Sequence, residues 1–230
     1  MTISVIIPTF NEDTTLADTL AHTSALGTQE IIVVDGGSTD LTVPTAQAFC
    51  AKTPDTYLLT APRGRARQMN EGAKASRGDV LLFLHADTQL PEHTGRIIDS
   101  AFADPTVVGG RFDVRFDSSS LWSRIIGSFM NRRSRLTGIS TGDQALFVRR
   151  QVFERLGGFA DIPLMEDIDF SRRLKRVGRI AALRDTVTTS FRRWETQGPL
   201  RTIFLMWTLR FLYWMGVSPH RLRHFYTAVR

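Results

Sequence analysis

Residues 79–88 read DVLLFLHADT, a run of apolar residues that ends abruptly in polar ones. So short a run suits a strand, and its continuous apolarity suits a strand covered by helices on both faces. Similar runs precede it at residues 4–7, 30–34 and 56–59, with helical patterns between them, including one at 64–76. This alternation predicts an α/β fold with a mostly parallel central sheet flanked by helices.

The second half of the chain is less regular but continues the same domain. Its patterns predict strands at 109–116 and 145–149 and helices at 119–135 and 169–177. A chain of 230 residues is long enough for one sizeable core and too short for two ordinary domains. We therefore predict a single domain over residues 1–198, with halves 1–104 and 105–198, followed by an apolar and basic helical tail over 199–230.

Positive charge is concentrated in the second half. The net charge is +6, and residues 111–230 carry 22 basic and 10 acidic side chains, against 7 and 13 in residues 1–110. Such an excess suits acidic ligands, anionic lipid or nucleic acid. Because no nucleic-acid-binding motif accompanies it, we expect no nucleic-acid partner.

Cysteine usage and hydropathy bear on the compartment. Cys50 is the single cysteine, which excludes an internal disulfide and a multi-cysteine zinc site. The longest apolar stretch, residues 203–217, is interrupted by Thr208 and Arg210 and is shorter than the roughly 20 residues that span a bilayer. We expect a cytoplasmic protein without a signal peptide or a transmembrane helix.

Polar residues follow three of the predicted strands. In an open parallel sheet, ligands bind beyond the carboxyl ends of the strands. Those ends carry residues 8–12 (PTFNE), 35–40 (DGGSTD) and 85–88 (HADT). Each segment alone is also typical of a turn that caps a helix. Together they would place several carboxylates in one cleft, where their repulsion favours a bound cation or hydrogen-bond donors.

Five segments, in this order, resemble family-2 glycosyltransferases with the GT-A fold, a Rossmann-like α/β domain. They lie between Thr2 and Gly178 and read SVIIPTFNE, VVDGGSTD, GRARQMNEGAKASRGD leading into VLLFLHADT, GDQALFVRRQVFERLGGF, and MEDIDFSRRLKRVG. The resemblance implies inverting transfer of a sugar from a nucleotide-diphosphosugar, either a UDP-sugar or a GDP-sugar, to a hydroxyl acceptor.

The same resemblance implies a donor site in the first half of the chain. Its members are Pro8, Thr9 and Glu12 at the base, Asp35 near the base and ribose, Arg65, Arg67 and Asn70 on the helix at 64–76, and Ala86. Arginines near a helix N-terminus favour a diphosphate. For each single arginine, the alternative is a solvated cationic helix face.

Asp87 matches the family's metal-binding aspartate, which holds Mg²⁺ or Mn²⁺ against the diphosphate of the donor. A hard cation with oxygen ligands suits that leaving group. The sequence departs from the family at His85, where an acidic residue is usual. His85 is expected as an outer metal ligand or a ribose contact. In a second departure, Met69 stands where the family often has arginine.

Glu166 and Asp167 match the family's acidic pair, in which the aspartate is the general base. Inversion in a single displacement requires a carboxylate that accepts the proton of the acceptor hydroxyl. The resemblance therefore assigns Asp167 as the base, and Glu166 is expected to orient the acceptor or support Asp167. The alternative is that these acids only stabilise the start of the following helix.

The sequence leaves two alternative functions open, and it leaves two possible contacts open for the tail at 199–230. A nucleotidylyltransferase would need a glycine-rich basic loop after the first strand, where residues 9–12 read TFNE. A sugar-nucleotide-binding protein without turnover is kept open by His85. The aromatic and basic tail suits either a protein contact, including a homo-oligomer, or an anionic membrane. A membrane contact would make the protein peripheral on the inner face of the cell membrane, with a lipid-linked acceptor.

Overall fold

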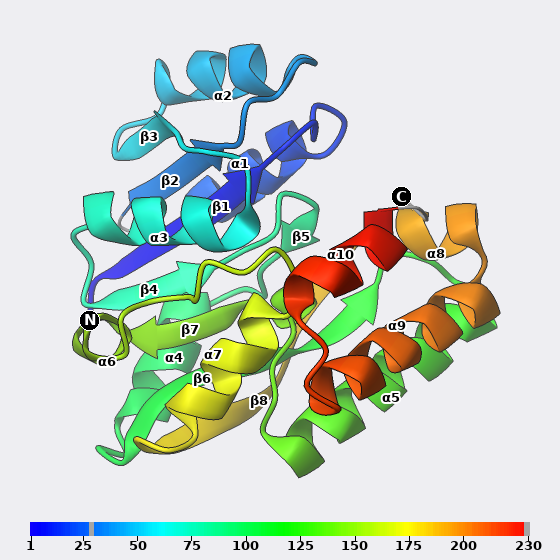
Figure 1. The fold of residues 1–230 in the computed structure, drawn as a ribbon. Coiled ribbons are helices and arrows are strands. Elements are labelled where there is room, and N and C mark those ends of the chain that lie inside the picture. Colours follow the sequence, from blue (N-terminus) through cyan, green and yellow to red (C-terminus); the bar gives the residue numbers. More distant parts are fainter. Residues whose placement is uncertain (28–29, 228–230) are drawn as a thin grey trace.

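A computed structural model describes residues 1–27 and 30–227 and shows helices packed on both faces of a central sheet (Figure 1). In chain order its elements are β1 (Ile3–Thr9), α1 (Leu16–Ala25), β2 (Glu30–Asp35), α2 (Thr42–Cys50), β3 (Thr56–Thr60), α3 (Arg65–Ala75), β4 (Val80–Phe83), β5 (Thr88–Gln89), α4 (Thr94–Phe102), β6 (Val107–Phe116), α5 (Leu121–Thr137), the 3₁₀ turn η1 (Gly142–Gln144), β7 (Leu146–Arg149), α6 (Arg150–Arg155), α7 (Glu166–Leu174), β8 (Arg179–Thr189), α8 (Arg192–Gln197), α9 (Pro199–Trp214) and α10 (Pro219–Thr227).

The sheet has the strand order β3-β2-β1-β4-β7-β6-β8-β5. The first four strands are parallel, with β1 between β2 and β4, which confirms the parallel arrangement predicted from their apolar runs. β7 is antiparallel to both β4 and β6, and it joins the two halves of the sheet. The carboxyl ends of β1, β2 and β4 consequently lie at one edge, where the predicted site residues follow them.

Alternate residues of each central strand serve two cores. In β1, Val5 and Ile7 pack into a cluster with α1, α2, α4 and α5, whereas Ile6 packs into a cluster with α3, α6 and α7. Because side chains alternate across a strand, a strand that is covered on both faces is apolar at nearly every position. The continuous runs of the sequence therefore reflect burial on both faces of the sheet.

The close approach of α3 to the sheet places the first turn of this helix at the cleft. A Cβ atom at Gly72 would lie 2.5 Å from Ile6 Cγ2 and 3.0 Å from Val34 Cγ2, so only glycine allows α3 to pack this closely. Arg65 and Arg67 stand at the start of this helix.

The structure corrects the expectation for the second half at two points. β8 was not predicted, although it pairs in parallel with β6 along most of its length. The helix expected at 169–177 begins at Glu166, so both members of the acidic pair lie in its first turn. The strands expected at 109–116 and 145–149 and the helix expected at 119–135 are confirmed as β6, β7 and α5.

The tail folds back onto the domain. Leu209 of α9 and Leu222 of α10 are buried against Met165 and Ile168, which flank the acidic pair. None of the described helices combines the length and hydropathy needed to cross a membrane. The last three positions of the predicted tail, residues 228–230, lie outside the described residues.

Candidate functional site

A single cleft of about 1130 Å³ opens at the carboxyl ends of β1 and β4 and extends to α5, α7 and α9. Most of the predicted site residues line it, namely Pro8, Thr9, Glu12, Arg65, Arg67, His85, Ala86, Asp87, Glu166 and Asp167. Because these residues come from strand ends, from α3 and from α7, only the folded chain brings them together. Their roles toward a ligand remain predictions.

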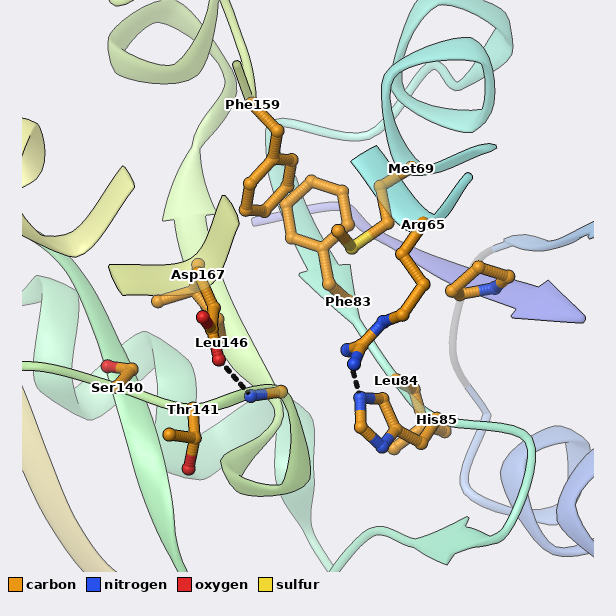
Figure 2. Close-up of a pocket in the computed structure, with 12 residues that line it drawn as sticks. Arg65, Met69, Phe83, Leu84, His85, Ser140, Thr141, Leu146, Phe159 and Asp167 are labelled. Carbon is orange, nitrogen blue, oxygen red and sulfur yellow. Dashed lines mark hydrogen bonds between the residues drawn. The ribbon is translucent and has the colours of Figure 1, made fainter. Parts of the chain in front are cut away.

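His85 lies between an arginine and an aspartate at the floor of the cleft. Arg65 Nη2 donates a hydrogen bond to His85 Nε2, as Figure 2 shows. An arginine can only donate, so Nε2 is the unprotonated nitrogen and Nδ1 carries the proton. His85 Nδ1 lies 3.2 Å from Asp143 Oδ1 and donates to it. Both ring nitrogens are therefore engaged, and a metal contact by Nε2 would require Arg65 to move.

Asp143 is held ionised by these neighbours. Burial opposes its charge, but the hydrogen bond from His85 and the nearby guanidinium groups of Arg65 and Arg193 hold the pKa of Asp143 at about 2. Asp143 is thus the fixed negative charge that orients His85.

Gly142 covers the contact between Arg65 and His85. A Cβ atom at this position would overlap both Arg65 Nη2 and His85 Nε2, so any larger residue would push the pair apart. The backbone N–H of Gly142 donates to Asp167 Oδ2 at 3.1 Å (Figure 2). The η1 turn therefore connects the His85 group with the acidic pair.

Glu166 and Asp167 begin α7 in different environments. Glu166 is buried, and its Oε1 lies 3.5 Å from Nε of Arg65, whose side chain is 44% exposed to the cleft. Burial, reinforced by the charge of Asp167 and opposed by Arg65, raises the pKa of Glu166. Asp167 is only half-buried and accepts the Gly142 N–H. Its carboxylate is thus the more open of the two.

The backbone is strained at two positions beside the site, directly before α7 and directly after η1. Met165, directly before Glu166, has φ of 70°, and Ala145, directly after η1, has φ of 45°. A non-glycine residue in the left-handed region costs free energy and persists only where the surrounding structure holds it. The buried side chain of Met165 packs against α9 and α10, which hold it in place.

Asp87 lies between β4 and β5. Because β5 pairs with β8, Asp87 lies beside the end of β8. Its Oδ1 lies 3.3 Å from Thr88 Oγ1 and 3.5 Å from Thr189 Oγ1, and the N–H of Ser190 donates to its backbone oxygen. Within residues 1–27 and 30–227, no three acidic, histidine or cysteine side chains form a ready-made metal cage. Mg²⁺ is usually held by one or two carboxylates together with substrate phosphates and water. Asp87 fits that mode of binding.

Arg192, which is distant in sequence, contacts residues of the predicted base pocket. Arg192 Nη2 donates to Glu12 Oε2 at 3.2 Å, and Arg192 Nη1 donates to Thr14 Oγ1 at 3.0 Å. The guanidinium of Arg63 stacks 3.7 Å from the centre of the Phe10 ring. These contacts form a charged and aromatic rim around Pro8 and Thr9.

Three predicted donor-site residues are engaged in contacts with the protein itself. Arg67 makes two parallel hydrogen bonds to Asp161, of 2.8 and 3.0 Å. Asn70 exchanges hydrogen bonds with the backbone of Phe159 and thereby fixes the loop before α7. Asp35 is buried and accepts the N–H groups of the two residues that follow Gly36, which is the arrangement of a turn.

Several arginines that line the cleft were not assigned to the site from the sequence, among them Arg133 of α5, Arg193 of α8 and Arg210 of α9. One signal was available. Arg133 follows Ile126 and Met130 at helical spacing, which places it beside the buried stripe of α5. The other two could not be assigned to the cleft before the position of the tail was known.

Comparison with known proteins agrees with this geometry. Residues 4–157 match the model of Glycosyl transferase family 2. A curated relative, the undecaprenyl-phosphate 4-deoxy-4-formamido-L-arabinose transferase of Pseudomonas paraeruginosa, is 33% identical over 159 residues, which cover 64% of this chain and 46% of the relative. The chain thus spans about half the length of the curated relatives it matches.

Two solved structures share the fold. S. aureus TarS 1-349 in complex with UDP-GlcNAc superposes with a TM-score of 0.65 at 16% identity, over 83% of this chain and 58% of TarS 1-349. The mannosyltransferase PcManGT from Pyrobaculum calidifontis, in complex with GDP-Man and Mn²⁺, gives a TM-score of 0.62 at 23% identity, over 82% of this chain and 56% of PcManGT. Both similarities confirm the predicted GT-A fold.

Proposed function

Glycosyltransferase family 2 is the family to which this chain belongs, and from that premise we propose that it transfers a sugar from a nucleotide-diphosphosugar to a hydroxyl acceptor with inversion at the anomeric carbon. One observation carries the proposal. Asp87 after β4 and Asp167 at the start of α7 line the same cleft as Pro8, Thr9 and Glu12. A site for a charged leaving group and a site for a base therefore share one cavity.

The donor would lie along the ends of β1 and β4. Its base would contact Pro8 and Thr9, and Glu12 would accept hydrogen bonds, while Arg63 and Arg65 would face the diphosphate. Asp87 would hold Mg²⁺ or Mn²⁺, which, when bound, offsets the negative charge of the leaving nucleoside diphosphate. The complexes of the structural relatives, with GDP-Man and Mn²⁺ and with UDP-GlcNAc, support this class of donor.

Asp167 would act as the general base. Its half-buried carboxylate is held by the Gly142 N–H on Oδ2 and can accept the proton of the acceptor hydroxyl as the oxygen attacks the anomeric carbon. Glu166 is better suited to orientation, because its carboxyl group is buried and contacts the guanidinium of Arg65. The acceptor is lipid-linked in this proposal, as the name of the undecaprenyl-phosphate relatives supports.

The donor is identified by a thermal-shift screen of UDP-sugars and GDP-sugars with Mn²⁺ or with a chelator. A ligand that binds only the folded state at 100 times its Kd should raise Tm by roughly 5 to 10 °C for a chain of this size. We expect that rise for one class of nucleotide sugar, and only with the metal. Equal stabilisation in the presence of chelator would remove the metal from the proposal, and no stabilisation by any nucleotide sugar would remove the donor.

We further propose that α9 rests on the inner face of the cell membrane. Leu200 and Phe204 are 66% and 75% exposed, and no acidic residue follows Glu195 in the sequence. Aromatic side chains favour the membrane interface, and each basic residue near an anionic leaflet contributes about 1 kcal/mol.

Vesicle co-sedimentation tests the membrane contact. The wild type should bind phosphatidylglycerol vesicles but not phosphatidylcholine vesicles, and the double variant Leu200→Ser/Phe204→Ser should lose this binding. Point substitutions are preferable to deletion of the tail, because α9 and α10 bury Met165 and Ile168. If neither vesicle type binds and the double variant instead dissociates an oligomer, the surface is a protein interface.

A further inference from the structure

A groove of apolar side chains runs from the reaction centre along α5 and α9, which lie side by side (Figure 1). The rings of Phe129 of α5 and Trp207 of α9 pack against each other, with centroids 5.5 Å apart, and both line the groove. Five side chains that line the groove remain about half exposed or more, namely Ile125 (49%), Phe129 (46%), Trp207 (58%), Phe211 (58%) and Trp214 (69%). Exposed apolar surface of this kind inside a cavity is typical of a site for an apolar ligand.

Three arginines stand where this groove meets the reaction centre. Arg133, Arg193 and Arg210 line the same cleft as Asp167. Nε and Nη2 of Arg133 and Nε of Arg193 are buried and have no hydrogen-bond partner among the described residues. Arg193 uses Nη1 to donate to the Tyr226 hydroxyl at 2.6 Å, which fixes its side chain across the tail. Buried N–H groups without an acceptor are costly, so these side chains are suited to a ligand that accepts several hydrogen bonds.

The electrostatics of the cluster also call for an anion. Burial and the neighbouring Arg210 lower the pKa of Arg133 to about 10, against the partial compensation of Asp167 and Asp143. Arg133 therefore remains charged at neutral pH while it is repelled by Arg210. A phosphate offers two negative charges and three acceptor oxygens, which match guanidinium groups in shape and charge.

We propose that Arg133, Arg193 and Arg210 bind the phosphate group of an amphiphilic acceptor, whose hydrocarbon chain lies in the groove between α5 and α9. This inference rests on the proposed function and specifies its acceptor. The cluster holds the phosphate within the cavity that contains Asp167, and the aromatic side chains hold the apolar end. The reacting hydroxyl of this acceptor is the P–OH of its phosphate: Asp167 accepts the P–OH proton, the phosphate oxygen forms the bond to the anomeric carbon, and the bond from that carbon to the nucleoside diphosphate breaks. Two features, the buried N–H groups of Arg133 and Arg193 that lack an acceptor and the apolar groove continuous with them, thus select one ligand that is anionic at one end and apolar at the other.

Binding can be measured without any turnover, because Trp207 and Trp214 line the groove and report its occupancy by their fluorescence. Farnesyl phosphate, farnesol and inorganic phosphate are titrated below micelle formation, with and without saturating nucleoside diphosphate and Mn²⁺. We expect farnesyl phosphate to bind at least 10-fold more tightly than either farnesol or inorganic phosphate. Nucleoside diphosphate should not displace it, because the donor occupies the other end of the cleft.

Matched variants measure separately what the arginines and the apolar groove contribute to binding. Arg133→Gln and Arg210→Gln should each weaken farnesyl phosphate by roughly 10- to 100-fold, the loss of charge-assisted hydrogen bonds. Arg132→Gln, an exposed neighbour on α5, should change nothing. Phe129→Ser should weaken farnesyl phosphate roughly 10-fold or more but leave inorganic phosphate unchanged.

Three results would overturn the proposal. Farnesol that binds as tightly as farnesyl phosphate would show that the arginines do not contribute, and unchanged affinity in both Arg133→Gln and Arg210→Gln would show the same. Displacement of farnesyl phosphate by nucleoside diphosphate would assign the arginines to the donor. The comparison of farnesyl phosphate with farnesol on the wild type shows whether the arginines contribute, even if a variant fails to fold. Any of these outcomes leaves the proposed glycosyl transfer intact, since donor binding is measured separately.

Discussion

Replacement of Asp167 by asparagine is expected to lower turnover by roughly 10² to 10⁴, the usual contribution of a positioned general base, while donor affinity stays near that of the wild type. Asparagine keeps the size of the side chain and can still accept the Gly142 N–H through its amide oxygen, so the turn at η1 should persist. It cannot accept a proton. The measurement is the rate of nucleoside diphosphate release at saturating donor and acceptor, together with donor affinity by calorimetry.

Glu166→Gln is the matched control for this result. Glutamine preserves the neutral form that burial favours, and the expected loss of turnover is smaller than for Asp167→Asn. Wild-type turnover in Asp167→Asn combined with a large loss in Glu166→Gln would reverse the assignment. A large loss of donor affinity in Asp167→Asn would instead give Asp167 a role in donor binding.

Replacement of Asp87 by alanine should abolish the metal-dependent part of donor binding. Asp87 is the carboxylate at the end of β4 in a cleft without a ready-made cage among the described residues, so no neighbouring acidic cluster can take its place. Its side chain contacts only hydroxyl groups at more than 3.2 Å, and we therefore expect the melting temperature without ligand to change little. Calorimetric titration of the nucleotide sugar with Mn²⁺ and with chelator measures the effect.

Asp185→Ala, at an exposed position of β8, is the control for the loss of one negative charge. It should retain metal-dependent binding. Undiminished metal-dependent binding in Asp87→Ala would remove Asp87 from the metal site and would leave the metal without an assigned protein ligand.

The fold was predictable where burial dictates composition. β1, β2 and β4 lie between two layers of helices, so their central positions are apolar on both faces and the strands stand out in the sequence. β8 was missed because its surroundings impose no such pattern. It is half-exposed over most of its length and carries Arg184 and Asp185, and its place in the sheet depends on pairing with β6 and β5.

The candidate site was predictable where its residues follow a strand directly. His85, Asp87 and Thr9 could be placed at one edge from the parallel order of β1 and β4 alone. Contacts between distant segments could not be anticipated. Arg67 reaches Asp161 and Arg192 reaches Glu12, and the partners of these pairs are set by tertiary packing. The arginines of the proposed acceptor site come from α5, α8 and α9, which meet only after the tail folds back.

The anomeric configuration of the product distinguishes inverting glycosyl transfer from its alternatives. The wild type is incubated with Mn²⁺, the nucleotide sugar selected by the thermal-shift screen and a lipid extract or farnesyl phosphate, and the glycosylated product is examined by NMR. We expect release of nucleoside diphosphate and a product whose anomeric configuration is opposite to that of the donor. Retention of the donor's configuration would contradict single displacement with Asp167 as base, and release of pyrophosphate in place of nucleoside diphosphate would contradict glycosyl transfer itself.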